Sequence, residues 1–505
     1  MDAKERKEQD LDEKLEQEIL HEVEVGFLAN LVSWPVLMVV FGVCFWRITT
    51  RTVPYPYIDE IFHVSQTVRY INGAWSSWDP KITTPPGLYF LGWLNYHTMR
   101  VVSSWSTLTV LRLTNLIGGV VVLPAVVLRP LLLFNAIGFW PVSLMCFPLL
   151  ATFYFLYYTD VWSTIFILES LTLAITLPFG ETKSIWLSAL CALVSCYFRQ
   201  TNIVWNLFVM VVVIERRALI QKDFNTVNLN NYLKFVIHAL ENFAQLCVPY
   251  CVNFALFGVF VLYNRSLTLG DKDNHTAGIH LVQVFYCITF IMIFSMPIWI
   301  SKMGLRYYQG RVLTKRFRTA LELLAMMLVI RFFTVVHPFL LADNRHYTFY
   351  IFKKIIARNF WLKYAIMPWI YHFSVFHYIE AMRAKVMHFH PVLPIEIKNP
   401  TELPVQLTHI SWTVLIICTF MTVVPSPLFE PRYYILPFMF WRIFMTPVSE
   451  GVFADSDSQL GELKFCKRLF LELAWFLCID AITLMIFMFR SFSWETESHL
   501  QRIIW

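Results

Sequence analysis

The sequence predicts an all-α membrane protein that crosses a bilayer many times. Of its 505 residues, 57% are hydrophobic and only 15% are charged, whereas soluble domains carry roughly 25% charged residues. The mean hydropathy is +0.54. Aromatic residues make up 17% of the chain, as expected where Trp and Tyr line two membrane interfaces. A soluble protein of this length could not bury so much apolar surface, so we expect the lipid bilayer to be a partner.

Apolar segments long enough to span a bilayer recur along the chain. Because a spanning helix needs about 20 mostly apolar residues, we expect about 11–14 transmembrane helices. They lie near residues 26–47, 107–128, 138–158, 161–180, 184–198, 202–214, 243–263, 279–300, 319–337, 360–379, 409–424, 434–446 and 469–489. We therefore expect one membrane-embedded domain over residues 26–490, between a charged tail (1–25) and a C-terminal tail (491–505).

The distribution of Lys and Arg predicts the orientation. Residues 301–318 carry six of them, and Arg216, Arg217 and Lys467 lie in further basic segments on the same side as the N-terminus. Positive loops remain in the cytosol, so the N-terminus should be cytosolic and residues 48–106 should form the first luminal loop.

Charge and cysteine usage exclude several classes of function. The net charge of +6 is modest, and Lys and Arg are spread through loops rather than gathered in a stripe, so no nucleic-acid partner is expected. The 10 cysteines are scattered, without the spacing of a metal site. Sequences typical of P-loop, dinucleotide-binding and HExxH sites are absent, so no metal ion or cofactor is expected.

The first luminal loop opens with a helical pattern over residues 57–70. On a wheel of about 100° per residue, His63, Gln66 and Tyr70 lie within about 40° of Asp59. Apolar residues occupy the opposite side. The pattern predicts an amphipathic helix on the membrane surface, whose polar stripe faces whatever lies above it.

Two consecutive carboxylates begin this helix. Asp59 can act as a general base that takes the proton of an attacking hydroxyl group, and its charge would favour the oxocarbenium-like transition state of glycosyl transfer. The alternative is a carboxylate that is merely favourable at a helix start. Glu60 lies about 100° away, at the boundary of the polar stripe.

Other loops on the luminal side add aromatic and basic residues. Trp78 offers a flat face for stacking on a sugar, next to Asp79, although an interfacial Trp beside turn residues is an equal alternative. Arg199 interrupts an apolar stretch, where a charge is costly and usually functional. Arg432 precedes Tyr433 and can either bind a ligand or pair with the nearby Glu430 at the interface.

Four consecutive polar residues lie at another membrane boundary: Asp343, Asn344, Arg345 and His346. The planar guanidinium group of Arg345 suits a phosphate, and His346 can assist. Together with the two arginines above, these residues can form a basic pocket for a lipid phosphate.

Several of these segments resemble the family of dolichyl-phosphate-glucose-dependent α-1,2-glucosyltransferases. The resemblance runs in order along most of the chain, in PYIDEIFH (56–63), WDPKITTPPGLY (78–89), FLYYTD (155–160), FRQTNIVW (198–205), LLADNRHYTFY (340–350), RYYILP (432–437) and LQRIIW (500–505).

The resemblance implies a GT-C glycosyltransferase of the endoplasmic reticulum membrane with its active site in the lumen. It implies a dolichyl-phosphate glucose donor and a diglucosylated dolichyl-diphosphate oligosaccharide acceptor, the last step of lipid-linked oligosaccharide assembly for N-glycosylation, and inversion by single displacement. It also implies an acidic base in the first luminal loop, at Asp59 or Glu60, and the wheel favours Asp59.

Two other classes of function remain open from the sequence. A transporter or flippase of lipid-linked sugars would share the spans, the basic pocket and the aromatic residues, although internal repeats and broken helices would be expected. A non-catalytic scaffold for glycosylation enzymes would not need Asp59 at all.

Overall fold

The chain is almost entirely helical. The computed structural model describes residues 3–132, 138–220, 229–272, 278–334, 343–383, 405, 407–426, 429–447, 465–494, 497 and 499–505. Within these residues the only sheet is an antiparallel pair of short strands, β1 (Ser491–Phe492) and β2 (Gln501–Arg502). The prediction of a mostly helical protein is confirmed.

The main helices follow one another along the whole chain. They are α1 (Ala3–Arg47), α2 (Glu60–Ile71), α3 (Gly87–Arg100), α4 (Thr107–Ile117) with its continuation η2 (Gly118–Leu128), α8 (Asp160–Thr176), α9 (Glu181–Cys196), α10 (Ile203–Ile220), α11 (Leu229–Glu241), α12 (Val248–Asn264), α13 (Val282–Phe294), α15 (Lys302–Thr314), α16 (Arg316–Phe333), α18 (Tyr347–Ile351), α19 (Met367–Arg383), α20 (His409–Val423), α21 (Ile435–Phe444) and α22 (Phe465–Phe489).

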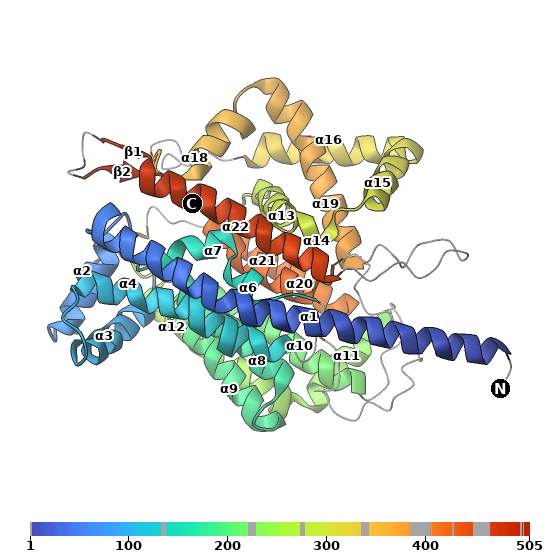
Figure 1. Ribbon diagram of the computed structural model, residues 1–505, viewed down its shortest axis with the longest axis horizontal. Helices are drawn as coiled ribbons and strands as arrows, with labels where there is room; N and C mark the ends of the chain where they lie inside the picture. The colour runs from blue at the N-terminus through green and yellow to red at the C-terminus, as the bar shows by residue number, and fades with distance from the viewer. Residues whose placement is uncertain are drawn as a thin grey trace.

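Among the described residues, four helical segments are long and apolar enough to cross a membrane. They are Gln17–Thr52, Thr107–Leu131, Phe243–Asn264 and Phe465–Phe489. Two of them, in α1 and α22, lie along the long axis of the molecule (Figure 1). Length and composition therefore make the chain a membrane protein.

The tail expected over residues 1–25 is not separate from the first apolar segment. Helix α1 begins at Ala3 and continues without a break to Arg47. The tail is rich in Glu, Lys and Gln, which are good helix formers. It therefore continues the helix of the first apolar segment toward the N-terminus.

The span expected near residues 138–158 was wrong. The structure has three short helices there: α6 (Pro141–Met145), α7 (Pro148–Ala151) and η4 (Thr152–Phe155). The two prolines start new helices because proline cannot donate a backbone hydrogen bond and restricts the residue before it. Nearly all side chains of these pieces are buried, so the segment fills the interior of the bundle.

One end of the molecule collects the segments that carry the candidate site. Helices α2 and α3 lie at the end opposite the N-terminus, together with the β1–β2 hairpin and α18 (Figure 1). Helix α2 begins later than the expected Tyr57, because Ile58 has a left-handed backbone (φ 51°). That conformation is unusual for a β-branched residue, and it leaves Asp59 at the N-cap.

A buried ion pair joins two helices of the apolar core. Arg442 of α21 donates through Nε and Nη2 to the two carboxylate oxygens of Glu472 in α22, at 2.6 and 2.8 Å. Both side chains are fully buried. Arg442 also donates to the carbonyls of Gly138 and Met445, so one guanidinium group holds three segments together.

We expect Glu472→Gln to lower the free energy of unfolding by about 3 kcal/mol or more, since it leaves a buried arginine without its counter-charge. Thermal unfolding of the purified protein in detergent measures this loss. Glu181→Gln is the matched control, because its pair with Arg217 is longer (3.6 Å) and partly exposed and should contribute little. Equal effects of the two substitutions would contradict the assignment.

Candidate active site

Asp59 presents an accessible carboxylate at the start of α2. Its backbone N–H donates to the hydroxyl oxygen of Tyr158 at 3.2 Å, which fixes the helix start. Its Oδ2 atom lies 3.0 Å from Nη1 of Arg432. The side chain is 36% exposed although protein surrounds it densely. A molecule that enters from this end can therefore reach the carboxylate.

Glu60, the neighbouring carboxylate, is in the opposite situation. It is fully buried, and its two oxygens accept from Nε and Nη2 of Arg112 at 2.8 and 2.6 Å. They also accept backbone N–H groups, from Tyr57 at 2.9 Å and from Tyr157 at 2.6 Å. These bonds join the segment before α2, helix α4 and the segment before α8. The Glu60 carboxylate has no contact with solvent.

Arg432 connects two acidic residues. It lies in η10 (Pro431–Tyr434), and its Nε donates to Oε2 of Glu430 at 2.5 Å while Nη1 donates to Asp59. The sequence left pairing with Glu430 as an alternative to ligand binding, and that pair is present. The same guanidinium group also reaches the candidate base.

A second ion pair lies beside the first. Nη2 of Arg199 is 3.2 Å from Oδ1 of Asp160, and the guanidinium group lies over the ring of Tyr433, 5.4 Å from its centroid. The other oxygen of Asp160 is buried and has no hydrogen-bond partner among the described residues. Tyr433 directly follows Arg432 in the chain, so its ring joins the Arg199 pair to the segment that carries Arg432.

The charge state of Asp59 depends on these neighbours. Burial alone would raise the pKa of Asp59, but the charges of Arg432, His63 and His346 and the hydrogen bond from Arg432 outweigh it, so the pKa lies below its usual value. Asp59 is therefore ionised at neutral pH. Removal of the positive charge of Arg432 would raise this pKa.

The polar stripe of α2 faces the interior of the protein. Nδ1 of His63 is 2.9 Å from the hydroxyl of Tyr89. Gln66 is fully buried and accepts the N–H of Asp79 at 3.1 Å while donating to the carbonyl of Ser77 at 2.6 Å. The stripe expected to face a substrate thus lies mainly against the following loop, and His63 is its member next to Asp59.

The remaining aromatic and acidic residues of the first loop also support that loop. Tyr70 is buried between the rings of Trp75 and Tyr89, and Trp78 lies half-buried against Tyr89, 5.7 Å between centroids. Asp79 accepts the backbone N–H of Lys81 at 3.0 Å. Among the described residues, none of these three side chains forms a hydrogen bond or ion pair with the carboxylate of Asp59, whose side-chain partner is Arg432.

Arg345 is already bound on several sides. It pairs with Asp343 through Nε–Oδ1 (2.9 Å) and Nη2–Oδ2 (2.7 Å), reaches Gln501 at 3.3 Å, and lies over the ring of Trp494 at 4.7 Å. Asn344 has a buried Oδ1 without a hydrogen-bond partner among the described residues. A phosphate would have to compete with Asp343 for this guanidinium group.

His346 lies next to Arg345 in the chain and also interacts with Asp59. It is 34% exposed, and its positive form contributes to the field that lowers the pKa of Asp59. Its Nδ1 is 3.3 Å from the carbonyl oxygen of Trp505. His346 therefore has an accessible ring close enough to Asp59 to interact with it.

The C-terminal segment was expected to be a tail, but it is part of this region. The hydroxyl of Tyr57 donates to the carbonyl of Arg502 at 2.6 Å and accepts the N–H of the same residue at 2.9 Å. Ile504 exchanges backbone hydrogen bonds with Arg345 (2.7 Å) and Tyr347 (2.9 Å). The resemblance of LQRIIW to the family was the one sequence signal that pointed to such a role.

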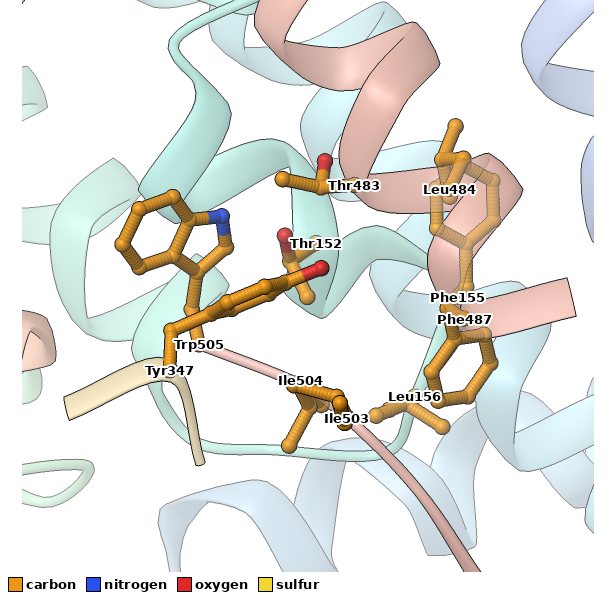
Figure 2. Close-up of a pocket in the computed structure, with 10 residues that line it drawn as sticks. All are labelled: Thr152, Phe155, Leu156, Tyr347, Thr483, Leu484, Phe487, Ile503, Ile504 and Trp505. Atoms are coloured by element: carbon orange, nitrogen blue, oxygen red, sulfur yellow. The ribbon is translucent and has the colours of Figure 1, made fainter. Parts of the chain in front are cut away.

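Figure 2 shows a small cavity beneath this segment, between Tyr347, Trp505 and the residues around Phe487. Its volume is about 20 Å³ and its walls are almost entirely apolar. It has room for little more than one water molecule, so it is a packing defect under the hairpin rather than a substrate site.

No metal centre is visible in the part of the chain that the structure describes. In those residues no three His, Cys, Asp or Glu side chains are grouped so that they could hold an ion. The site is instead built of carboxylates, arginines and aromatic rings, a donor and acceptor set suited to an anionic, hydroxyl-rich substrate.

Fold and site together define a helical membrane protein with an accessible, arginine-paired carboxylate at one end. The sequence profile described as the DIE2/ALG10 family matches residues 53–443. The chain belongs to this family.

Similar proteins cover nearly the whole chain. A Kluyveromyces lactis protein is 61% identical over 97% of this chain and 91% of its own length, and one from Candida glabrata is 56% identical over 97% and 95%. A human protein is 28% identical over 90% of this chain and 94% of its own length. Each is named Dol-P-Glc:Glc(2)Man(9)GlcNAc(2)-PP-Dol alpha-1,2-glucosyltransferase. No solved structure matches the chain.

The environment of His63 gives a prediction about pH. Burial, with the charges of Arg432 and Arg199 adding to it, lowers the pKa of His63 from 6.5 to about 4 although Asp59 opposes the shift. Between these values the unfolded chain binds a proton that the folded protein does not, so stability falls as the pH drops. The loss at acidic pH is at most about 3 kcal/mol.

We expect His63→Asn to weaken this pH dependence, measured as thermal unfolding between about pH 7 and about pH 5. The exposed His97 provides the control, since His97→Asn should keep the wild-type slope. A His63→Asn protein that loses stability with pH as steeply as the wild type would show that His63 is not held neutral.

Proposed function

We propose that the protein transfers a glucose from dolichyl-phosphate glucose, in α-1,2 linkage, to the diglucosylated oligosaccharide Glc2Man9GlcNAc2 on dolichyl diphosphate. The observation that carries this function is the 61% identity, over 97% of the chain, to a relative named for that activity. The transfer completes the lipid-linked oligosaccharide used for protein N-glycosylation.

Asp59 is the general base of this reaction. The acceptor hydroxyl oxygen attacks the anomeric carbon of glucose and gives its proton to Asp59, while the bond from that carbon to the phosphate oxygen breaks. Dolichyl phosphate leaves with the bonding electrons, and the configuration inverts in a single displacement. The accessibility of Asp59 and the complete burial of Glu60 support this choice between the two adjacent carboxylates.

Arg432 links donor binding to the activation of the base. Its Nη1 now holds Asp59, which lowers the basicity of that carboxylate. When Arg432 turns to the donor phosphate, Asp59 loses part of its positive field and becomes more basic. Asp59 would thus become a stronger base at the moment when dolichyl-phosphate glucose is bound.

Arg199, Tyr433 and His346 complete the phosphate side of the site. Arg199 lies over Tyr433, and His346 is partly exposed near Asp59. Arg345 contributes less directly, because Asp343 and Gln501 already occupy its guanidinium group. His63 supports Asp59 from the buried side, while Gln66, Tyr70, Trp78 and Asp79 hold the first loop in shape.

The architecture we propose is that of a GT-C enzyme of the endoplasmic reticulum membrane. Residues 26–490 form the membrane domain with about 11–14 spans, and residues 48–106 form the first luminal loop with α2 and α3 lying at the membrane surface. Helix α2, whose N-cap is Asp59, and the N-terminus lie at opposite ends of the molecule, which supports a luminal site and a cytosolic N-terminus (Figure 1).

The test is glucose transfer by purified protein in detergent, with dolichyl-phosphate glucose and the diglucosylated acceptor. We expect Asp59→Asn to lower turnover about 100-fold or more while donor binding persists. Glu60→Gln should instead lower stability, because Arg112 is left buried without a counter-charge, with near wild-type turnover in the folded fraction.

Two outcomes would contradict these assignments. Transfer by Asp59→Asn at the wild-type rate would exclude Asp59 as the base. If the folded wild-type protein transfers no glucose, the transferase function fails, and a transporter or scaffold would have to be tested in its place.

Arg432→Gln should weaken donor binding about tenfold or more, since hydrogen bonds to charged groups are worth about 1.5–3 kcal/mol. It should also move the acidic limb of the rate profile to higher pH, because Asp59 loses the cation that lowers its pKa. Arg345→Gln serves as the comparison and should change donor binding less. If Arg345→Gln weakens donor binding more than Arg432→Gln does, Arg345 is the main phosphate ligand.

A further inference from the structure

A large cleft lies away from the site described above, between α15, α16 and α19. Its volume is about 900 Å³, the size of a site for a substantial ligand. Helix α15 lies toward the end of the molecule where α1 begins, whereas α2 and α3 lie at the opposite end (Figure 1). The cleft is therefore separate from Asp59 and its partners.

The floor of the cleft is a built network of polar side chains. Glu322 accepts from Arg311 at 2.8 and 2.9 Å and from Arg318 at 3.0 Å, and it lies 3.0 Å from Nε2 of His372. Nδ1 of His372 is 2.9 Å from the hydroxyl of Tyr308. These bonds connect α15, α16 and α19, so the three helices are held at a defined separation.

The charges that line the cleft are unbalanced. Four cationic side chains line it against two carboxylates, and the network described above already surrounds Glu322 with cations. Among the described residues, the side chains of Arg306 and Lys315 form no ion pair or hydrogen bond, and both residues are exposed. The cleft thus offers two unpaired cations to an anion.

Several apolar residues of the lining lie at the surface. Met303 and Tyr307 are both 55% exposed, and Ile379 is 40% exposed, in the same cleft as Arg306. No residue of α15 is buried. Cations beside exposed apolar side chains suit a ligand with an anionic head group and a hydrocarbon chain.

We propose that this cleft binds an anionic phospholipid of the bilayer leaflet at the N-terminal end of the protein. Arg306 and Lys315 bind the head-group phosphate, and the acyl chains lie along Met303 and Ile379. The charge of the cleft is complementary to such a lipid, and basic pockets between membrane helices at the cytosolic face commonly hold anionic head groups. The proposal does not depend on the transferase activity.

The experiment is a native mass spectrometry titration of the full chain in detergent micelles, with phosphatidylserine or phosphatidylcholine. We expect the wild-type protein to bind phosphatidylserine more tightly than phosphatidylcholine. In the double variant Arg306→Gln/Lys315→Gln the affinity for phosphatidylserine should fall about 30-fold, if each cation contributes as much as one basic side chain near an anionic membrane.

A matched variant controls for the general loss of charge. Lys302→Gln/Arg316→Gln removes two exposed cations, one at the start of α15 and one at the start of α16, and neither of these side chains lines the cleft. This variant should bind phosphatidylserine like the wild type. Thermal unfolding establishes that both variants are folded, and because all four side chains are exposed we expect little change.

Three results would overturn the proposal. The first is wild-type affinity for phosphatidylserine in Arg306→Gln/Lys315→Gln, and the second is an equal loss in Lys302→Gln/Arg316→Gln. The third is competition by glycerophosphoserine, which lacks acyl chains, as effective as that of the intact lipid, because the ligand would then be a soluble phosphate. Glucose transfer is not a readout, so failure here is distinct from failure of the proposed function.

Discussion

The buried pair between Glu60 and Arg112 is the constraint on which the candidate site depends. Two charges without access to water are stable only when they are paired and their remaining hydrogen-bonding groups are satisfied. Arg112 donates to the carbonyls of Val53 and Tyr55 as well as to Glu60, and Glu60 accepts the N–H of Tyr157. The segment before α2, helix α4 and the segment before α8 are thereby fixed together, and Asp59 projects from that rigid frame.

Adjacent residues of the same chemistry thus acquire different roles from their surroundings. Glu60 is surrounded by donors of the protein, whereas Asp59 has one ion-pair partner among the described residues, Arg432, and an exposed face. A carboxylate with a single exchangeable counter-ion can change its basicity when that counter-ion moves. The strain at Ile58 lies directly before this pair, where the chain leaves the first carboxylate, Asp59, partly exposed and turns the next one, Glu60, into the interior.

Much of this region could be predicted from local patterns, and the remainder required the fold. Apolar composition predicts the helical membrane protein, and the helical wheel separates Asp59 from Glu60 by direction. The wheel cannot identify Arg112 as the partner of Glu60, because 52 residues separate them. Hydropathy alone also predicts a span over 138–158, where prolines divide the chain into short buried helices. Distance in sequence and the local effect of proline account for both differences.

The hairpin after α22 has a consequence for how the protein is made. Tyr57 and Arg502 hydrogen-bond to each other across 445 residues of sequence, so this contact cannot form until every helix between them has been synthesised. Domains often fold as they emerge during synthesis, yet here the region around Asp59 is complete only once β2 is present. A nascent chain inserted in the membrane but still lacking β2 therefore has its candidate base without the support of Arg502, and the finished geometry is reached only after residues 501 and 502 have been synthesised.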